Sequence, residues 1–395
     1  MNIEDKLAQR TKNMSASAIR EILKVVGLPG MISLAGGNPD PSTFPIEFIK
    51  NNIHQIIDKY GSTLFQYGIT EGFDPLRIAL SQYLKSIGIK VDYKSVFIST
   101  GAQSAINTAS AVLVDKGDKV GVEAPTYLNS LKTFKTFEPE FIELITDKDG
   151  IIPAELIKTI QKHKLKLIYL QPNFQNPTGQ TIPNDRRIEI AKIIKEHELI
   201  AIEDDPYHEL NFSNQKFTTL YELVPENIIY IGSLSKIFSP GLRLGFYLGP
   251  SVITEKMVSI KQGIDINTDV FAQAIATEYL NSDFFRKNLK YIQDLYSTKA
   301  LCMINAINQF FPSEIEYTDV LGGMFIWCKY NKSLNTSLIY QESIEQKVAF
   351  VPGSTFFITP PENFTMRLNF TNVSEEKIIE GIKILGNILK KVIAS

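Results

Sequence analysis

The sequence predicts an α/β protein with a large, mostly parallel sheet and a second, smaller α+β domain. Two observations carry this prediction. The chain has 395 residues, which at about 150 residues per domain indicates two domains. Its middle third alternates short apolar runs with helical patterns, and strands separated by helices form parallel sheets that are covered on both faces.

The expected strands are short, apolar, β-prone runs bounded by turn residues. They cover Val96–Thr100, Lys119–Glu123, Lys166–Gln171, Leu199–Glu203, Asn227–Gly232 and Leu242–Leu248. Helical patterns separate them. One starts near Gly101 and stops at Gly117, and another lies between Gly179 and Leu199 with apolar positions at three- and four-residue spacing.

The C-terminal part follows a different pattern. A long helical pattern spans roughly Asp269 to Phe310, and the chain closes with the helical segment SEEKIIEGIKILGNILKKVIAS. Between them lie IEYTDVLGGMFIWCKY, KVAFVPGSTFF and NFTMRLNFT, which predict an antiparallel sheet. The segment before LAGGNPDPSTFP is expected to pack near this sheet. We therefore expect a large domain at residues 45–285, and a small domain at residues 1–44 plus 286–395.

Composition argues against several classes of protein. The net charge of −2 offers no bulk field for nucleic acid or an anionic membrane. No apolar run approaches the ~18 residues of a membrane span, and the N-terminus lacks a signal-peptide core, so we expect a cytoplasmic protein. Cys302 and Cys328 are not in metal-ligand spacing, and the four histidines fall in no metal motif, so no catalytic metal is expected.

The stretch IIYIGSLSKIFSPGLRLGF carries the strongest chemical signal. In open α/β sheets, ligands collect at the carboxyl ends of strands, and here a buried strand is followed by Ser233, Ser235 and Lys236. A lysine is costly at such a place unless its pKa falls or it reacts covalently. Arg243 adds a planar donor fork that suits a phosphate. The alternative is a serine-lysine dyad like that of some hydrolases.

Other strand ends carry weaker signals. Residues 101–103 open a helix whose free N–H groups favour a phosphate, although a glycine turn with an ordinary cap has the same pattern. Asn176 offers an amide to a ligand or is a plain turn residue. Asp204, with Tyr207 three residues on, needs a cation because burial of a carboxylate is costly. A protonated heteroaromatic nitrogen, a metal or a salt bridge would serve.

Together these strand ends supply one amine nucleophile, one carboxylate, one amide and a phosphate cradle. A phosphorylated pyridine aldehyde bound to lysine as a Schiff base needs this set, because the carboxylate keeps the ring nitrogen protonated and the ring then acts as an electron sink. We therefore expect Lys236 to form the imine, while Ser233, Ser235 and Arg243 hold the phosphate.

These residues belong to an ordered series of motifs from about Ser15 to the C-terminus. The motifs are SAIREIL, ISLAGGNPDPSTFP, FQYGITEG, STGAQSA, EAPTY, FQNPTG, EDDPY, SLSKIFSPGLRLG, KQG, GGMFIW, VAFVPG and MRLNF. The chain resembles the fold-type I pyridoxal 5'-phosphate (PLP) aminotransferases of class I/II, and most of all their 2-aminoadipate and kynurenine aminotransferase subgroup. The resemblance implies a large sheet of the seven-stranded type, PLP as cofactor, and a homodimer with shared active sites.

The resemblance also implies roles at the matching positions. Lys236 would carry the cofactor and shuttle the proton, and Asp204 would pair with the pyridine nitrogen. Tyr67 would come from the other subunit, and Ala102 stands where relatives often carry serine, so one hydroxyl contact is expected to be missing. The implied cofactor-binding residues are Tyr67, Ala102, Gln103, Tyr127, Asn176, Asp204, Tyr207, Ser233, Ser235, Lys236 and Arg243.

Substrate binding is implied at fewer positions. Arg367 would clamp the substrate α-carboxylate, assisted by Asn176 and the Gly37 backbone; otherwise it is an exposed strand arginine. Tyr67 would reach the phosphate or the substrate. Arg20 would pair with an acidic side chain; otherwise it lies on a solvated helix face. The expected donors are 2-aminoadipate, glutamate, aromatic or branched-chain L-amino acids, and the expected acceptor is a 2-oxo acid such as 2-oxoglutarate.

Three rival functions are weighed against this one. A PLP-dependent β-lyase or decarboxylase would use the same scaffold, because fold does not fix function. The effector domain of a PLP-dependent transcription regulator is disfavoured, since only about 30 residues precede LAGGNPD and a DNA-binding domain needs more. A serine-lysine hydrolase would leave Asp204, Asn176 and Arg367 without roles.

Overall fold

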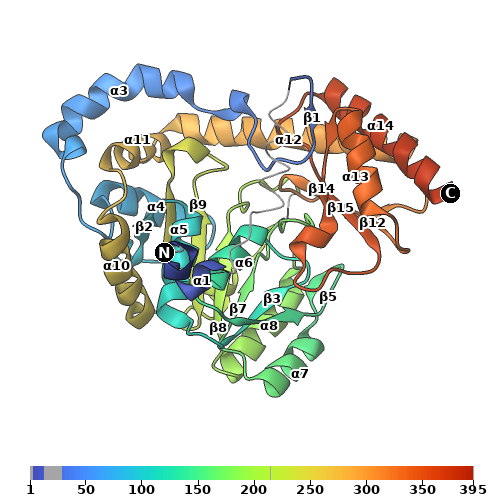
Figure 1. The fold of residues 1–395 in the computed structure, drawn as a ribbon. Helices are drawn as coiled ribbons and strands as arrows, with labels where there is room; N and C mark the ends of the chain where they lie inside the picture. Colours follow the sequence, from blue (N-terminus) through green and yellow to red (C-terminus); the bar gives the residue numbers. More distant parts are fainter. Residues whose placement is uncertain (1–2, 13–28, 214, 395) are drawn as a thin grey trace.

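The computed structural model describes residues 3–12, 29–213 and 215–394. A seven-stranded sheet flanked by helices forms the larger part of the molecule, and a four-stranded sheet forms the core of the smaller part (Figure 1). The large sheet confirms the α/β fold with a mostly parallel sheet that the sequence predicts. The expected domain boundaries remain a prediction.

The strands of the large sheet lie in the order β2-β10-β9-β8-β7-β3-β4. In that order they span Phe97–Ser99, Gly245–Leu248, Ile228–Ser233, Ile200–Asp205, Leu167–Leu170, Lys119–Glu123 and Glu140–Leu144. Strand β10 runs antiparallel to β2 and β9, and the pairs from β9 to β4 are parallel. Every predicted strand is present, with ends shifted by up to three residues. Strand β4 was not predicted, because its glutamates interrupt the apolar pattern of an edge strand.

Helices cover both faces of this sheet. One face packs against α5 (Ala102–Leu113), α6 (Leu128–Lys135) and α10 (Ser251–Asp265). The other packs against α4 (Asp74–Ser86), α7 (Pro153–His163), α8 (Asn184–Glu196) and α11 (Val270–Leu280). Within β7, Leu167 and Tyr169 face the first layer, while Ile168 and Leu170 face the second. Because both faces are buried, the strand is apolar throughout instead of alternating with polar residues.

The single long helix expected from Asp269 to Phe310 is wrong. The structure has two helices there, α11 and the 28-residue α12 (Asp283–Phe310). Ser282 lies between them in an extended conformation, and its side chain accepts a hydrogen bond from the Phe285 backbone N–H. A serine in this position caps a helix N-terminus, so the chain starts a new helix instead of continuing the first.

The smaller sheet is antiparallel, as predicted. Its strands β11 (Glu316–Tyr317), β12 (Phe325–Tyr330), β15 (Phe364–Asn369) and β14 (Val351–Pro352) lie in that order. Helices α12, α13 (Thr336–Glu345) and α14 (Glu375–Ala394) lie beside it (Figure 1). Of the segment before LAGGNPD, Ile32 and Ser33 lie beside the small sheet as expected. They form β1, which pairs in parallel with β13 (Val348–Ala349).

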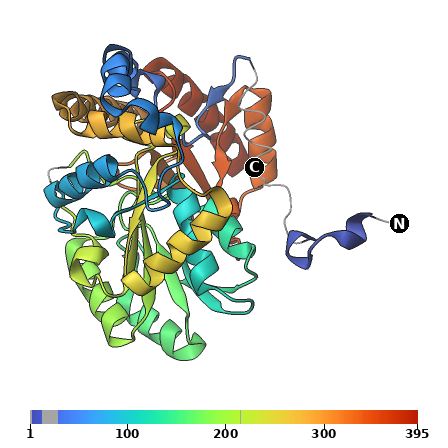
Figure 2. The same cartoon turned by 90° about the vertical axis from the view of Figure 1, so that its left-hand side faces the viewer.

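The remaining elements are peripheral to these sheets. They are η1 (Ile3–Lys6), α1 (Gln9–Lys12), η2 (Pro41–Thr43), α3 (Ile46–Tyr60), η3 (Gly61–Phe65), η4 (Tyr93–Ser95), β5 (Thr146–Asp147), β6 (Gly150–Ile151), α9 (Leu220–Leu223), η5 (Pro240–Leu242) and η6 (Gly353–Phe356). Residues 3–12 stand away from the body of the molecule (Figure 2). Within the described ranges, no helix has both the length and the apolar character needed to cross a membrane.

Candidate active site

One cavity of about 300 Å³ collects nearly all the residues that the sequence singles out. It lies where strands β7, β8 and β9 end, between α5 and β15. Its lining includes the predicted Gly37, Ala102, Gln103, Tyr127, Asn176, Asp204, Tyr207, Ser233, Ser235, Lys236, Arg243 and Arg367. Tyr67 does not line it and is 78% exposed. Arg20 lies outside the described residues.

The charges around this cavity are unbalanced. Lys236, Arg243 and Arg367 contribute three cations, and Asp204 is the one carboxylate among the described lining residues. Such an excess of positive charge in a concave site favours an anionic ligand. Two arginines with planar donor forks fit a molecule that carries a phosphate and a carboxylate.

Lys236 follows strand β9 and points into the cavity. Its ammonium donates a hydrogen bond to the Gly37 carbonyl oxygen at 2.8 Å. Burial, together with the positive charges of Arg243 and Arg367, lowers the pKa of Lys236 to about 8. A lysine with this pKa is partly a free amine near neutral pH, which is the form that attacks an aldehyde.

The N-terminus of α5 and Arg243 form one corner of the cavity. Gly101, which precedes the helix, has φ +80°, and a Cβ atom there would lie 2.4 Å from Arg243 Nη2. A Cβ atom at Gly245 would lie 2.6 Å from the Ala102 backbone nitrogen. Glycine at both positions therefore lets the guanidinium and the strand lie against the free N–H groups of the helix, which is a favourable arrangement for a phosphate.

Asp204 is the penultimate residue of strand β8 and is almost fully buried, with 1% exposure. Its Oδ2 accepts hydrogen bonds from the Tyr169 hydroxyl at 2.6 Å and from Gln171 Nε2 at 2.7 Å. Its Oδ1 has no partner within the part of the chain that the structure describes. Burial raises the pKa of Asp204 to about 6, against the lowering effect of the two donors. An unpaired buried carboxylate oxygen is costly, so Oδ1 fits a cationic ligand group.

Arg367 belongs to β15, and its side chain lines the same cavity as Asp204. Its Nη1 donates to Asn176 Oδ1 at 2.7 Å and its Nη2 to the Ala35 carbonyl oxygen at 2.6 Å. The guanidinium carbon lies 4.3 Å from the Phe325 ring centroid, and Nε has no partner among the residues described. The arginine is 5% exposed, so the alternative of an exposed strand arginine is wrong. A buried, oriented guanidinium of this kind can bind a carboxylate.

Gln171 and Tyr169 are site residues that the sequence analysis missed. Gln171 lines the cavity, and both side chains contact Asp204. The position of Gln171 directly after a buried strand was an available signal. Tyr169 sits within that strand, where a tyrosine looks like an ordinary core residue, so its contact with Asp204 needed the structure.

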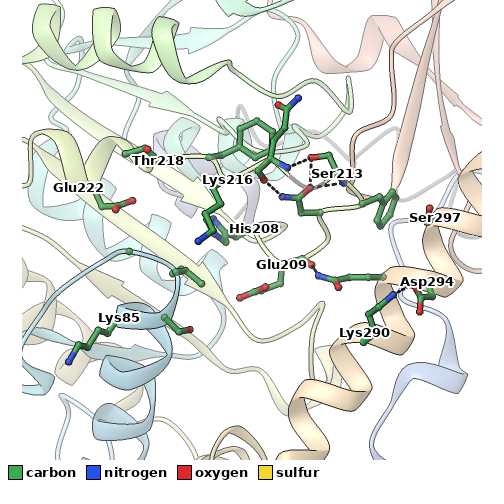
Figure 3. Close-up of a pocket in the computed structure, with 18 residues that line it drawn as sticks. Lys85, His208, Glu209, Ser213, Lys216, Thr218, Glu222, Lys290, Asp294 and Ser297 are labelled. Carbon is green, nitrogen blue, oxygen red and sulfur yellow. Dashed lines mark hydrogen bonds and ion pairs between the residues drawn. The ribbon is translucent and has the colours of Figure 1, made fainter.

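A second cavity, of about 600 Å³, holds none of the predicted site residues (Figure 3). Its lysines and acidic residues come from α4, α9, α12 and the segment between β8 and α9, and Lys290 already pairs with Asp294. Its wall includes His208, whose Nδ1 lies 2.9 Å from the buried Asp205 carboxylate. Between the two cavities, the smaller one carries the amine, the unpaired carboxylate oxygen and the guanidinium, so we place the candidate active site there. Within the described ranges, no group of His, Cys, Asp and Glu residues could hold a metal ion.

Known proteins resemble the chain over nearly its whole length. A family model described as aminotransferase class I and II matches residues 29–385. Aromatic-amino-acid aminotransferase 1 of Thermococcus litoralis is 35% identical, covering 99% of this chain and 95% of the relative.

Solved structures agree with this similarity. The kynurenine aminotransferase of Pyrococcus horikoshii has a TM-score of 0.94 at 37% identity, covering 99% of this chain and 98% of that one. The α-aminoadipate aminotransferase of Thermus thermophilus, complexed with N-(5'-phosphopyridoxyl)-L-leucine, has a TM-score of 0.91 at 33% identity. The match covers 100% of this chain and 100% of that one.

Proposed function

The chain belongs to the class I and II aminotransferases and is a PLP-dependent enzyme, and we propose that Lys236 carries the cofactor while amino groups move between an L-amino acid and a 2-oxo acid. The family and the cofactor are those predicted from the motifs. The donors we propose are 2-aminoadipate, glutamate, aromatic and branched-chain amino acids, with 2-oxoglutarate as an acceptor.

The observation that carries the proposal is the convergence of four groups on one cavity. Lys236 supplies an amine, Arg243 beside the N-terminus of α5 supplies a phosphate cradle, and Asp204 supplies an unpaired carboxylate oxygen. Arg367 supplies a guanidinium on the β15 side. PLP has an aldehyde, a phosphate and a pyridine nitrogen, so the residues present fit it group by group, and Arg367 is left for a substrate carboxylate.

When bound, PLP supplies an electron sink that makes the substrate α-proton acidic. The residues of this chain provide the rest of the chemistry. Arg243, Ser233, Ser235 and the backbone N–H groups of Ala102 and Gln103 would hold the phosphate. Asp204 Oδ1 would hold the ring nitrogen in its protonated state. Lys236 Nζ would accept the substrate α-proton and act as general base.

The neighbouring side chains would orient the ring and the substrate. Tyr127 would stack on the ring, and Asn176 and Tyr207 would bond its phenolic oxygen. Arg367 would take the α-carboxylate of the substrate with help from Asn176 and the Gly37 backbone. The position of Arg367 within hydrogen-bond distance of Asn176 supports this arrangement. The role of Arg20 in binding an acidic side chain stays a prediction.

The chain further supports a homodimer, in which Tyr67 would reach the cavity of the partner subunit. Phe65, Tyr67 and Ile69 are each more than half exposed. The Phe65 ring stacks on Phe271 at a centroid distance of 5.9 Å, beside the segment that carries the exposed Ile266. An exposed apolar surface of this kind is typical of a protein–protein interface, and a second copy would cover it.

A visible absorption spectrum during substrate addition tests the proposed reaction. The purified enzyme with PLP should show a yellow band that disappears with L-2-aminoadipate and returns with 2-oxoglutarate, with a 2-oxo acid as the product. Release of ammonia or carbon dioxide in place of amino transfer would instead indicate a lyase or a decarboxylase. A band that ignores 2-aminoadipate but responds to an aromatic donor would keep the reaction and correct the substrate.

A further inference from the structure

We propose that Tyr169 and Gln171 are positioning residues that turn the Asp204 carboxylate so that its Oδ1 faces the pyridine nitrogen of the cofactor. The inference rests on the proposed function, because it assumes that Asp204 meets the ring nitrogen. Tyr169 lies in β7 and Gln171 directly follows that strand. Their proposed role is exerted through Asp204 and not by contact with the reacting atoms.

Both donors reach the same oxygen of Asp204. The Tyr169 hydroxyl and the Gln171 amide approach Oδ2 at 2.6 Å and 2.7 Å. All three side chains are buried, with exposures of 0% for Tyr169, 2% for Gln171 and 1% for Asp204. Two donors on one oxygen fix the plane of the carboxylate. They leave Oδ1 without a hydrogen-bond partner among the described residues.

The same donors govern the charge of Asp204. Burial raises the pKa of this carboxyl, and the Asp205 carboxylate acts in the same direction, while the hydrogen bonds from Tyr169 and Gln171 lower it. A hydrogen bond to the charged form favours that form. Without the two donors, the pKa of this buried carboxyl would be higher, so less of it would carry the charge that a protonated pyridine nitrogen needs as its partner.

The amide of Gln171 can have only one orientation. Its Oε1 accepts the Asn176 backbone N–H at 3.0 Å, so its Nε2 must face Asp204. The Gln171 backbone N–H donates to Glu123 Oε2 at 2.9 Å, which holds the residue in place. Gln171 therefore links Asp204 to Asn176, the residue that also bonds Arg367. Substitution by methionine keeps the length of the side chain and adds no charge. It removes the donor to Asp204 together with the acceptor for Asn176.

Core packing alone does not account for the Tyr169 contact. Tyr247 of β10 packs in the same apolar cluster as Tyr169 and is 1% exposed. Its hydroxyl has no hydrogen-bond partner in the described part of the chain. A tyrosine in this cluster therefore does not need a carboxylate beside its hydroxyl. Tyr247→Phe makes the same chemical change in the same cluster without touching Asp204, which makes it the matched control.

The test compares how tightly the cofactor-free enzyme binds PLP and the deaza analogue, in which a CH group replaces the ring nitrogen. The ratio of the two dissociation constants reports the contact between Asp204 and the nitrogen. General losses of stability affect both ligands and cancel. Each of Tyr169→Phe and Gln171→Met should lower the preference for PLP about tenfold, as expected for the loss of one hydrogen bond to a charged group. Tyr247→Phe should keep the wild-type ratio.

The outcomes separate the two proposals. If the wild-type enzyme binds PLP and the analogue equally well, Asp204 does not hold the ring nitrogen and the proposed role of Asp204 fails. If the wild type prefers PLP and the Tyr169 and Gln171 variants keep that preference, the positioning role fails while the proposed function stands. A fall in the ratio for Tyr247→Phe equal to that for Tyr169→Phe would also overturn the inference.

Discussion

Replacing Arg367 by lysine is expected to slow transamination strongly while leaving the fold intact. The guanidinium is buried, and two of its nitrogens are held by Asn176 and the Ala35 carbonyl. A lysine keeps the positive charge and loses the fork. The substrate carboxylate then loses at least one hydrogen bond to a charged group, which contributes about 1.5–3 kcal/mol.

The lost hydrogen bond corresponds to a fall of roughly 10- to 150-fold in kcat/KM. The ammonium of lysine also replaces the two contacts that the guanidinium makes with Asn176 and Ala35. Any cost of that exchange is present with and without substrate, so it lowers the stability of the protein and not kcat/KM. Stopped-flow absorbance of the amino-donor half-reaction measures the fall in kcat/KM directly.

An amine that lacks the α-carboxylate provides the control. The rate of Arg367→Lys with 5-aminopentanoate, the amine related to 2-aminoadipate, should stay within a few-fold of the wild-type rate. Thermal unfolding, followed by the fluorescence of Trp327, the only tryptophan in the chain, checks the fold. An equal fall in rate with 5-aminopentanoate and with 2-aminoadipate would refute the assignment of Arg367 to the carboxylate.

Two further predictions concern the phosphate cradle at Gly101 and the pKa of Lys236. Gly101→Ala should weaken PLP binding and destabilise the protein, because the added methyl group would meet Arg243 and the residue has a positive φ. Gly117→Ala also places alanine at positive φ, +84°, but meets nothing within 4 Å. Gly117→Ala should therefore lower the unfolding temperature without weakening PLP binding. Equal PLP affinities of Gly101→Ala and Gly117→Ala would count against the phosphate cradle. The rate at which PLP attaches to the cofactor-free enzyme should rise as pH rises through about 8, because the lowered pKa of Lys236 sets the fraction of free amine. The buried Lys236 ammonium also destabilises the folded protein at lower pH. This destabilisation declines as the pH rises from about 8 towards the ordinary pKa of a lysine side chain. An attachment rate that falls across this range would contradict the pKa assigned to Lys236.

Much of the site was predictable because parallel strands meet at their carboxyl ends. Asp204 lies near the end of β8 and Lys236 follows β9. These strands are neighbours in the sheet, so a sequence that places a carboxylate and a lysine at the ends of these strands also brings them together in space. Arg367 was harder, since its strand belongs to the other sheet, and it was assigned through the resemblance of the MRLNF motif.

The contacts that depend on register could not be predicted. Tyr169 reaches Asp204 because β7 and β8 pair in parallel with Leu170 opposite Glu203. A shift by one residue would turn the Tyr169 side chain to the opposite face of the sheet. The break between α11 and α12 was missed for a local reason. The helical period continues across Ser282, and the competing signal was a single capping serine.

Reduction of the PLP-loaded enzyme with borohydride, followed by peptide mass mapping, tests the central assignment most directly. We expect a phosphopyridoxyl group fixed on the peptide that carries Lys236, and none in the Lys236→Ala variant. A phosphopyridoxyl group on another buried lysine, such as Lys261 or Lys299, or no labelled peptide at all, would contradict the assignment of Lys236 as the residue that carries PLP.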